Sequence, residues 1–331
     1  MTTQTQQPTS VRGLYRYHDV FGLLSLGGAG FSNPVAVALG PDGLVYVANR
    51  ANPNQPDAVR ITKCTKEGAY VGEFGALGEG EGEFIWVTDI AFNHKGELAL
   101  SDEHCHRITI FDGECRFLHR FGHYGAGDGQ MDRPSGVAFD SGGNLFVVDA
   151  LNHRVQVFTP RGRFLTQWGS FGGGEGQFNM PWGIAIDREG DVYVTDWRND
   201  RVQKFSPEGR FLTAFGSSGS SEGEFNRPNG ITVDAGGDIY VCDWMNDRVQ
   251  VFDSKGNYKD TLIGHSGLSK WARTYLDASP LVEEKLNLAT QNIEPKMRFY
   301  RPFSVQVDED GMVFVVDGYR HRVQIYQKLP I

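Results

Sequence analysis

Ten residues of the sequence, DWRNDRVQKF (196–205), bring an acid, an aromatic ring and a base together, since Asp196, Trp197 and Arg198 are consecutive. Such a cluster can bind a ligand, because the ring supplies contact area and the charges orient polar groups. Other side chains capable of acid–base chemistry lie elsewhere: Arg50, Asp89, Glu103 and His104. A cluster that marks one site must occur once, whereas a structural element can recur.

The cluster recurs, because the chain repeats itself. Each copy carries a marker residue, and four of these markers are spaced by 47 residues: Asp102, Asp149, Asp196 and Asp243. Asp317 follows Asp243 by 74 residues, and Asn49 precedes Asp102 by 53 residues. These markers define six copies of one unit, and a repeat of this period indicates a solenoid or a propeller.

Each copy contains four short runs of alternating residues separated by turns. In the third copy these runs are GVAFD (136–140), NLFVVD (144–149), RVQVFT (154–159) and RFLTQW (163–168). Four such strands per unit predict a propeller blade. The sixth copy stops after its third strand, so residues 11–22 are expected to supply the fourth strand and close the ring. The predicted fold is all-β, a six-bladed β-propeller.

The units resemble NHL repeats, whose signature is an aspartate at a strand end followed by Asn-His/Asp-Arg and an alternating strand. The matching triplets are Asn152-His153-Arg154, Asn199-Asp200-Arg201, Asn246-Asp247-Arg248 and Arg320-His321-Arg322. The resemblance covers about residues 11–327, although the first copy has Asn49 for the aspartate and NPNQPD in place of the triplet. It implies a six-bladed propeller. NHL propellers are often interaction modules, and some six-bladed relatives are lyases or hydrolases.

The expected organisation is a disordered start (1–10), a single propeller (11–331) and a helical insertion within it (265–297), between the fifth and sixth blades. Ser269 can cap a first helix that carries Trp271 and Tyr275. Ser279-Pro280 begins a second helix, with an apolar stripe of Val282, Leu286 and Ala289. The insertion is expected near the mouth of the propeller, as a lid, a partner-docking element or a dimer contact.

Composition limits the classes of function. The net charge of −9 and the pI of about 5.5 make nucleic-acid binding a minor alternative. The four cysteines form no metal or disulfide pattern, which fits a reducing compartment. The polar N-terminal stretch is not a signal peptide, and no segment is apolar enough to cross a membrane. We therefore expect a soluble, cytoplasmic protein.

Residues that recur on every blade are expected to be structural. Asp196 should cap the turn after the second strand, with Arg201 reaching back toward it. His106, His153 and His321 occupy the repeat position of Asp200 and Asp247, so they do not predict a metal site. The glycine-rich connectors lack the Lys-Ser/Thr of a phosphate loop and open no helix. No cofactor and no metal are predicted.

The residues that do not recur define the candidate site, on the face where the connections between blades emerge. The candidate ligand-binding residues are Trp182, Trp197, Arg198, Asn229, Trp244, Phe303 and Tyr319. The candidate catalytic residues are Arg50, Asp89, Glu103, His104 and Arg198. The aromatic residues could form one wall of a pocket opposite a charged wall on blade 2, or they could simply pack at the rim.

Three functions remain open. The preferred one is a propeller that binds a partner protein or a small ligand on the lidded face of the central channel. The alternative is an enzyme at the channel mouth, a lyase or hydrolase. The amidating-lyase relatives hold their metal with histidines after the entrance proline, and no histidine occupies that position here; a gluconolactonase-like site would find two ligands, Asp89 and Asn229, and no third. RNA binding through Arg50, Arg198 and Arg320 is the minor alternative, and the sequence does not predict the oligomeric state.

Overall fold

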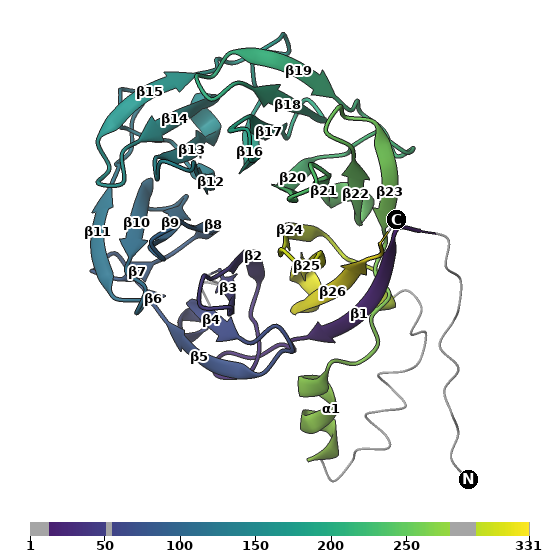
Figure 1. Cartoon of the computed structure of the whole chain (residues 1–331). Coiled ribbons are helices and arrows are strands. Elements are labelled where there is room, and N and C mark those ends of the chain that lie inside the picture. The colour runs from purple at the N-terminus through teal and green to yellow at the C-terminus, as the bar shows by residue number, and fades with distance from the viewer. Residues whose placement is uncertain (1–12, 51–54, 279–295, 331) are drawn as a thin grey trace.

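The computed structural model describes residues 13–50, 55–278 and 296–330. Within them the chain forms a ring of six four-stranded antiparallel sheets around a central axis (Figure 1). The six-bladed propeller predicted from the 47-residue period is therefore confirmed. Alternating, β-branched and aromatic sequences form the strands, and the recurrent Asp/Gly turns separate them.

The innermost strand of every blade begins next to the connection from the preceding blade. These strands are β2 (Pro34–Leu39), β8 (Val87–Phe92), β12 (Pro134–Phe139), β16 (Pro181–Ile186), β20 (Pro228–Val233) and β24 (Pro302–Val307). The second strands are β3 (Val45–Asn49), β9 (Leu98–Asp102), β13 (Leu145–Asp149), β17 (Val192–Asp196), β21 (Ile239–Asp243) and β25 (Met312–Asp317).

The third strands are β4 (Arg60–Cys64), β10 (Arg107–Phe111), β14 (Arg154–Phe158), β18 (Arg201–Phe205), β22 (Arg248–Phe252) and β26 (Arg322–Lys328). The outermost strands are β5 (Tyr70–Phe74), β11 (Phe117–Phe121), β15 (Phe164–Trp168), β19 (Phe211–Phe215), β23 (Tyr258–Leu262) and β1 (Tyr15–Phe21). A short parallel pair, β6 (Ala76–Leu77) and β7 (Glu83–Phe84), lies in the connection between blades 1 and 2. Short 3-10 helices are η1 (Pro56–Ala58), η2 (Ala150–Asn152), η3 (Trp244–Asn246) and η4 (Gly318–Arg320).

The ring closes where the two ends of the chain meet. β1 is the outermost strand of blade 6 and pairs antiparallel with β26, so that Tyr15 lies opposite Lys328. Figure 1 shows this contact as the purple strand against the yellow one. The backbone N–H of Leu329 also donates to the carbonyl of Leu14 at 2.8 Å. The predicted closure by the N-terminal strand is confirmed, and it covers an edge of β26 that would otherwise be unpaired.

Each contact between neighbouring blades (a seam) has its own apolar core. In the seam between blades 3 and 4, for example, Phe178, Val192 and Phe205 are fully buried. Near the axis the inner strands approach so closely that a Cβ at Gly183 would lie 2.1 Å from the carbonyl oxygen of Asn229. Glycine is required there by this contact and not by its backbone angles.

The marker aspartates hold each blade together at the end of its second strand. Asp196 is fully buried, and its Oδ1 accepts a hydrogen bond from the N–H of Asn179 in the incoming connection at 2.7 Å. Its Oδ2 accepts from Asn199 at 2.8 Å and from Arg201 Nε at 2.9 Å. The predicted pairing with Arg201 is present. The predicted contact with the following turn is made through the Asn199 side chain, and the same carboxylate also holds the connection before the blade.

The recurrent histidines are also structural. Nδ1 of His153 accepts a hydrogen bond from the N–H of Met180 on the next blade at 3.0 Å, and His106 and His321 accept in the same way across their own seams. At the equivalent positions Oδ1 of Asp200 accepts from Arg227 at 2.7 Å. These residues adopt positive φ, from 50° to 57°. Each is therefore an acceptor for the backbone of the next blade.

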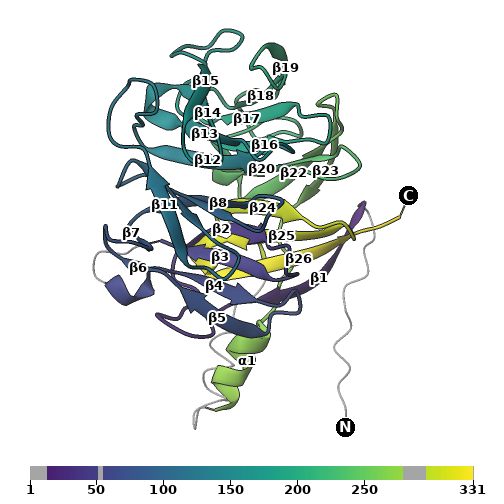
Figure 2. The same ribbon diagram turned by 60° about the vertical axis from the view of Figure 1, so that its left-hand side comes forward.

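The insertion forms a helix, α1 (Lys270–Asp277), with the predicted cap: the N–H of Ala272 donates to Ser269 Oγ at 3.1 Å. Trp271 packs against Phe21 and Phe31, with ring centroids 5.9 and 5.4 Å away. The helix thus lies at the outer edge of the ring, at the seam between blades 6 and 1, and away from the expected position over the mouth (Figures 1 and 2). The predicted second helix lies outside the described residues. None of the described helices is long and apolar enough to span a membrane.

Candidate functional site

The propeller has two different faces. The connections between blades and the loops between second and third strands emerge on one face, called the connector face here. The turns between first and second strands, such as the turn at residues 234–238, emerge on the opposite face, called the turn face. The variable residues singled out in the sequence follow either the entrance proline or the marker aspartate, so they gather on the connector face.

Six aromatic rings form a continuous chain across blades 4, 5 and 6 on the connector face. They are, in order of contact, Trp182, Trp197, Trp244, Phe303, Tyr319 and Tyr300. Consecutive ring centroids are 6.4, 6.3, 6.0, 5.9 and 5.4 Å apart. This set is called the aromatic arc. Five of its members were predicted ligand-binding residues, and Tyr300 was not.

Guanidinium groups lie over the rings of the arc. The Cζ atom of Arg227 is 4.7 Å from the centroid of Trp197, and that of Arg301 is 4.5 Å from the centroid of Trp244. Arg198 lies 5.8 Å from the ring of Trp197. Cation–π contacts of this kind hold the guanidinium in place and leave its N–H groups available at the edges.

The repeat explains how these arginines are positioned. Arg227 and Arg301 directly precede the entrance prolines and adopt positive φ, 59° and 61°. Their N–H groups donate to Asp200 and Asp247 of the preceding blade at 2.7 and 2.8 Å. Each arginine is therefore fixed at the seam, and its side chain covers the tryptophan that follows the marker aspartate of the preceding blade.

The central channel is nearly closed. Its cavity has a volume of about 30 Å³, about the volume of one water molecule, whereas ligand pockets typically have ~300–1,000 Å³. Trp182 and Phe303 of the arc line it. Asp89 is the one ionisable side chain among the residues that line it.

Asp89 is held by the backbone. Its two oxygens accept hydrogen bonds from the N–H of Ile90 at 2.9 Å and, across the seam, from that of Val137 at 3.0 Å. Burial raises the pKa of Asp89 to about 7, although these hydrogen bonds act in the opposite direction. Its carboxyl group therefore titrates near neutrality, in a space without room for a substrate.

The predicted charged wall on blade 2 is partly assembled. Arg50 forms an ion pair with the buried Glu103, and its guanidinium lies 5.0 Å from the ring of Trp86. His104 stacks edge-on against the same ring, with centroids 5.5 Å apart. The acid and the base neutralise each other, and Asp89 lies apart from them in the channel. The cluster is a packed ionic group centred on Trp86, which was not predicted from the sequence.

Asn229 does not join the arc. Its side chain is 3% exposed, and its Oδ1 accepts from the N–H of Gly230 at 2.6 Å. Its carbonyl accepts from the Thr195 hydroxyl at 2.7 Å, across the seam. Among the described residues, no group of three or more His, Cys, Asp and Glu side chains is arranged to hold a metal ion.

Comparison with known families identifies the repeat. The NHL repeat model matches residues 131–158, 178–205 and 225–252. Blades 3, 4 and 5 therefore contain NHL repeats. Each match covers the first three strands of one blade, from blade 3 to blade 5, and the NHL signature triplets predicted on blades 3, 4 and 5 lie inside these matches. No curated protein is similar enough in sequence to count as a relative.

Solved structures share the fold of this propeller at low sequence identity. A streptogramin B lyase is 12% identical, with a TM-score of 0.58 over 95% of this chain and 97% of the other. A gluconolactonase from Xanthomonas campestris is 15% identical, with a TM-score of 0.62 over 93% and 89%. A protein of unknown function from Bacteroides thetaiotaomicron is 18% identical, with a TM-score of 0.63 over 93% and 72%. These similarities concern the fold.

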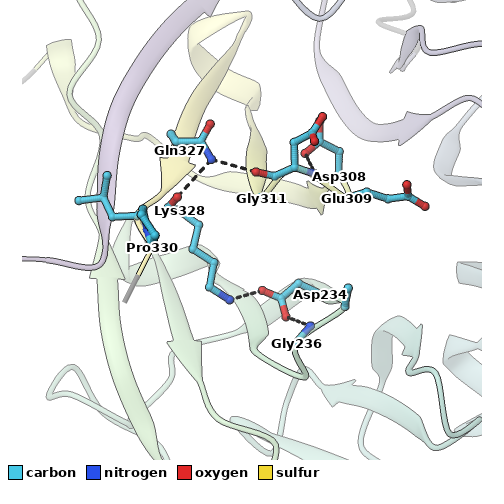
Figure 3. A pocket seen from close by; sticks show the side chains of 11 residues that line it. Asp234, Gly236, Asp308, Glu309, Gly311, Gln327, Lys328 and Pro330 are labelled. Carbon is cyan, nitrogen blue, oxygen red and sulfur yellow. Dashed lines mark hydrogen bonds and ion pairs between the residues drawn. The ribbon is translucent and has the colours of Figure 1, made fainter.

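The turn face of the propeller carries a groove of about 550 Å³ between blades 5 and 6. Figure 3 shows Lys328 reaching from one side of it to Asp234 on the other. Lys328 also contacts Asp238 at 2.8 Å, so it bridges two carboxylates of blade 5. Glu309 and Asp310 are exposed at the rim. The groove is thus an acidic seam whose lining lysine is already paired.

Arg227, Arg301 and Tyr300 were not predicted from the sequence. The sequence did contain an indication of these residues. The two positions before the entrance proline vary between blades as strongly as the positions after it, from which the candidate residues were taken. The residues directly before the innermost strands are Asn33, Trp86, Arg133, Met180, Arg227 and Arg301. Arg227 and Arg301 each follow a blade whose marker aspartate precedes a tryptophan, so the sequence could have indicated that they lie next to Trp197 and Trp244.

Proposed function

We propose that this protein is a non-catalytic binding module whose connector face takes up a polypeptide segment through the aromatic arc. The observation that supports this most directly is the continuity of the arc, in which six rings contact one another across blades 4 to 6. Four guanidiniums lie over these rings, those of Arg198, Arg227, Arg301 and Arg320. Tryptophan, tyrosine and arginine are the side chains that contribute most to protein interfaces.

The exposure of the arc supports the same function. Tyr300 and Tyr319 are 45% and 53% exposed, and Met245 beside Arg301 is 39% exposed. The other four rings of the arc are half-buried, so the exposed part of the arc lies at its Tyr319–Tyr300 end. A partly exposed apolar surface with fixed cations at its margin is typical of a partner site.

An enzyme at the channel mouth has less support. Asp89 has the pKa of a general base, but it faces a cavity of about 30 Å³ and has no second ionisable group among its neighbours in that cavity. Glu103 and Arg50, the other candidate pair, neutralise each other. The likeness to the lyase and the gluconolactonase concerns the fold and does not supply the missing groups.

The test uses two alanine substitutions that the repeat already accepts, because blade 3 has Ala150 where blades 4 and 5 have Trp197 and Trp244. Peptides are selected from a random display library on the full-length protein, and their affinities are measured by fluorescence polarisation. We expect Trp197→Ala/Trp244→Ala to weaken the selected peptides by at least tenfold.

A turn-face variant serves as the matched control. Glu309→Ala/Asp310→Ala removes two exposed carboxylates far from the arc, and it is expected to leave the affinities unchanged. Both variants should keep the circular dichroism spectrum of the parent. The proposal is overturned if the selected peptides bind equally well to the tryptophan variant, or if their binding is lost only in the turn-face variant.

A further inference from the structure

Trp197 is the second ring of the arc, and two guanidiniums lie over it. Arg198 and Arg227 lie 5.8 and 4.7 Å from the centroid of its ring, and they belong to different blade elements, a loop and a connection. In residues 13–50, 55–278 and 296–330, neither guanidinium forms an ion pair or a side-chain hydrogen bond. Both therefore keep their donors for a group outside the chain.

Arg50, Arg201 and Arg301, which also lie on the connector face, differ in this respect. Arg50 is paired with Glu103, and Nε of Arg301 lies 4.0 Å from Asp247. Arg201, which lies four residues from Trp197, is bound to Asp196 and to carbonyls of the connection. Within the described residues of the arc, Trp197 is the ring at which two uncommitted guanidiniums lie over a half-buried aromatic surface.

A guanidinium stacked on tryptophan is suited to carboxylates. Its planar fork presents parallel N–H groups that match the two oxygens of a carboxylate, and stacking removes part of its hydration. Two such groups at one ring fit two carboxylates close together. Trp182 and Trp244, with centroids 6.4 and 6.3 Å from Trp197, flank this point and offer apolar surface for a neighbouring aromatic or aliphatic side chain.

We infer that the subsite at Trp197 recognises a short acidic peptide motif, in which two carboxylate side chains pair with Arg198 and Arg227 and an adjacent aromatic or large aliphatic side chain packs on Trp182 or Trp244. This inference rests on the proposed function and names the chemistry of the partner. The pairing needs no cofactor and no movement of the backbone, because both arginines are anchored through their own N–H groups: Arg198 to the carbonyl of Asn179 at 3.0 Å and Arg227 to Asp200 at 2.7 Å.

Charge favours a short motif over a long polyanion. The chain carries a net charge of −9, and the seam carboxylates Asp200 and Asp247 lie next to Arg227 and Arg301. A nucleic acid gains affinity by neutralising many phosphates along a basic track. Two uncommitted guanidiniums flanked by carboxylates are instead suited to a motif with two anionic side chains.

The repeat supplies substitutions that remove the guanidiniums with little risk to the fold. Blade 5 has Met245 at the position of Arg198, and blade 4 has Met180, with a φ of 56°, at the position of Arg227. The test variant is therefore Arg198→Met/Arg227→Met. Arg188→Met, on the turn face, is the matched control for loss of a surface arginine.

The probe is a fluorescein-labelled dodecapeptide library of fixed composition with two adjacent Asp or Glu residues and one Trp, Phe or Leu within two positions. Its comparison library carries Asn and Gln in place of the acids. We expect the acidic library to bind the double methionine variant ~10- to 100-fold more weakly than the parent. The amide library should bind the parent at least tenfold more weakly than the acidic library does. Binding of the acidic library to the parent should also decline between 50 and 300 mM salt. Arg188→Met should behave like the parent.

The outcomes separate this inference from the proposed function. If peptides bind through Trp197 and Trp244 but the amide library binds equally well, or the methionine variant keeps its affinity, the acidic motif is wrong and the binding surface stands. If a fluorescein-labelled single-stranded U12 oligonucleotide binds more tightly than every acidic peptide and loses that affinity in the methionine variant, the arginines serve a nucleic acid and the inference is overturned. If no peptide depends on the tryptophans, both proposals fail.

Discussion

Nδ1 of His153 accepts a hydrogen bond from the backbone N–H of Met180, 3.0 Å away on the neighbouring blade. The bond requires a neutral imidazole, since a protonated ring has no acceptor nitrogen. Met180 adopts a φ of 56°, so the hydrogen bond also stabilises a backbone conformation that residues other than glycine rarely adopt. Protonation state and blade packing are thereby linked at this seam.

The first prediction concerns acid stability. Burial lowers the pKa of His153 and of His321, so the unfolded chain takes up these protons before the folded one does. The free energy of unfolding should therefore decrease as the pH falls from about 6.5 through the lower, folded-state pKa values. His153→Asn keeps an acceptor and does not titrate, so we expect a shallower decrease, which urea unfolding between pH 8 and pH 5 measures.

Asp200→Asn is the control, because it introduces the same asparagine at the equivalent position of blade 4, where the native acceptor is a carboxylate and not an imidazole. It should leave the slope between pH 6.5 and pH 5 unchanged. His153→Ala, which leaves the N–H of Met180 without its partner, should cost about 1–2 kcal/mol at pH 8. An unchanged pH dependence in His153→Asn would separate this histidine from the acid response.

The second prediction concerns Asp89, whose pKa is raised to about 7 by burial. Between pH 4 and 7 the folded state holds a proton that the unfolded state has lost, so the stability contributed by the protonated carboxyl group is lost as the pH rises through 7. Asp89→Ser copies blade 6, where Ser304 Oγ accepts the N–H of Val37 at 3.3 Å. The free energy of unfolding of this variant minus that of the parent should increase by about 1–3 kcal/mol as the pH rises from 4 to 8. A constant difference across this range would show that Asp89 is ionised throughout.

The third prediction concerns the packing of inner strands. Gly183→Ala places a methyl group 2.1 Å from the carbonyl oxygen of Asn229 and 3.2 Å from the side chain of Ile231, so the seam between blades 4 and 5 must open. We expect a loss of about 2–3 kcal/mol in the free energy of unfolding. Gly173→Ala is the control, since no atom lies within 4 Å of the point that its methyl group would occupy. Equal effects of the two substitutions would contradict the close approach at the axis.

The fourth prediction concerns the helix at the closing seam. Trp271→Ala removes the ring that packs on Phe21 of β1 and on Phe31 of the connection to blade 1. We expect a loss of about 1–3 kcal/mol, together with faster proteolysis of the N-terminal strand. Arg273→Ala, an exposed position on the same helix, should change the stability by less than ~0.5 kcal/mol. A Trp271→Ala protein as stable as the parent would mean that α1 does not reinforce the closure.

The sequence predicted those features that depend on the repeat. The number of blades follows from the 47-residue period and the marker aspartates, because every blade has the same four strands and packs against its neighbours in the same way. The closing strand follows from the incomplete sixth copy. The arc was partly predictable for the same reason: Trp197 and Trp244 occupy a position that the repeat leaves free. The location of α1 was not predictable, since Trp271 could cover any apolar surface within reach. Only the three-dimensional arrangement shows that Trp271 packs against Phe21 and Phe31.

The guanidiniums over the arc were missed for another reason. Arg227 and Trp197 are 30 residues apart and belong to different blades, and their contact depends on a positive φ before a proline, which the residue preceding a proline rarely adopts. The second role of Asp196 was missed similarly, because its partner Asn179 lies in the preceding connection. Contacts across a connection follow from the geometry of the ring and not from local pattern.

The pairing of β1 with β26 has a consequence for synthesis. Tyr15 and Lys328 are neighbours in the folded sheet, yet 313 residues separate them along the sequence, so the ribosome makes Tyr15 long before Lys328. At about 5–20 residues per second, β1 must remain without its partner for roughly 15–60 seconds. During that interval five blades can form in order while the ring stays open. Closure of the ring by β1 and β26 therefore joins two segments that are synthesised far apart in time.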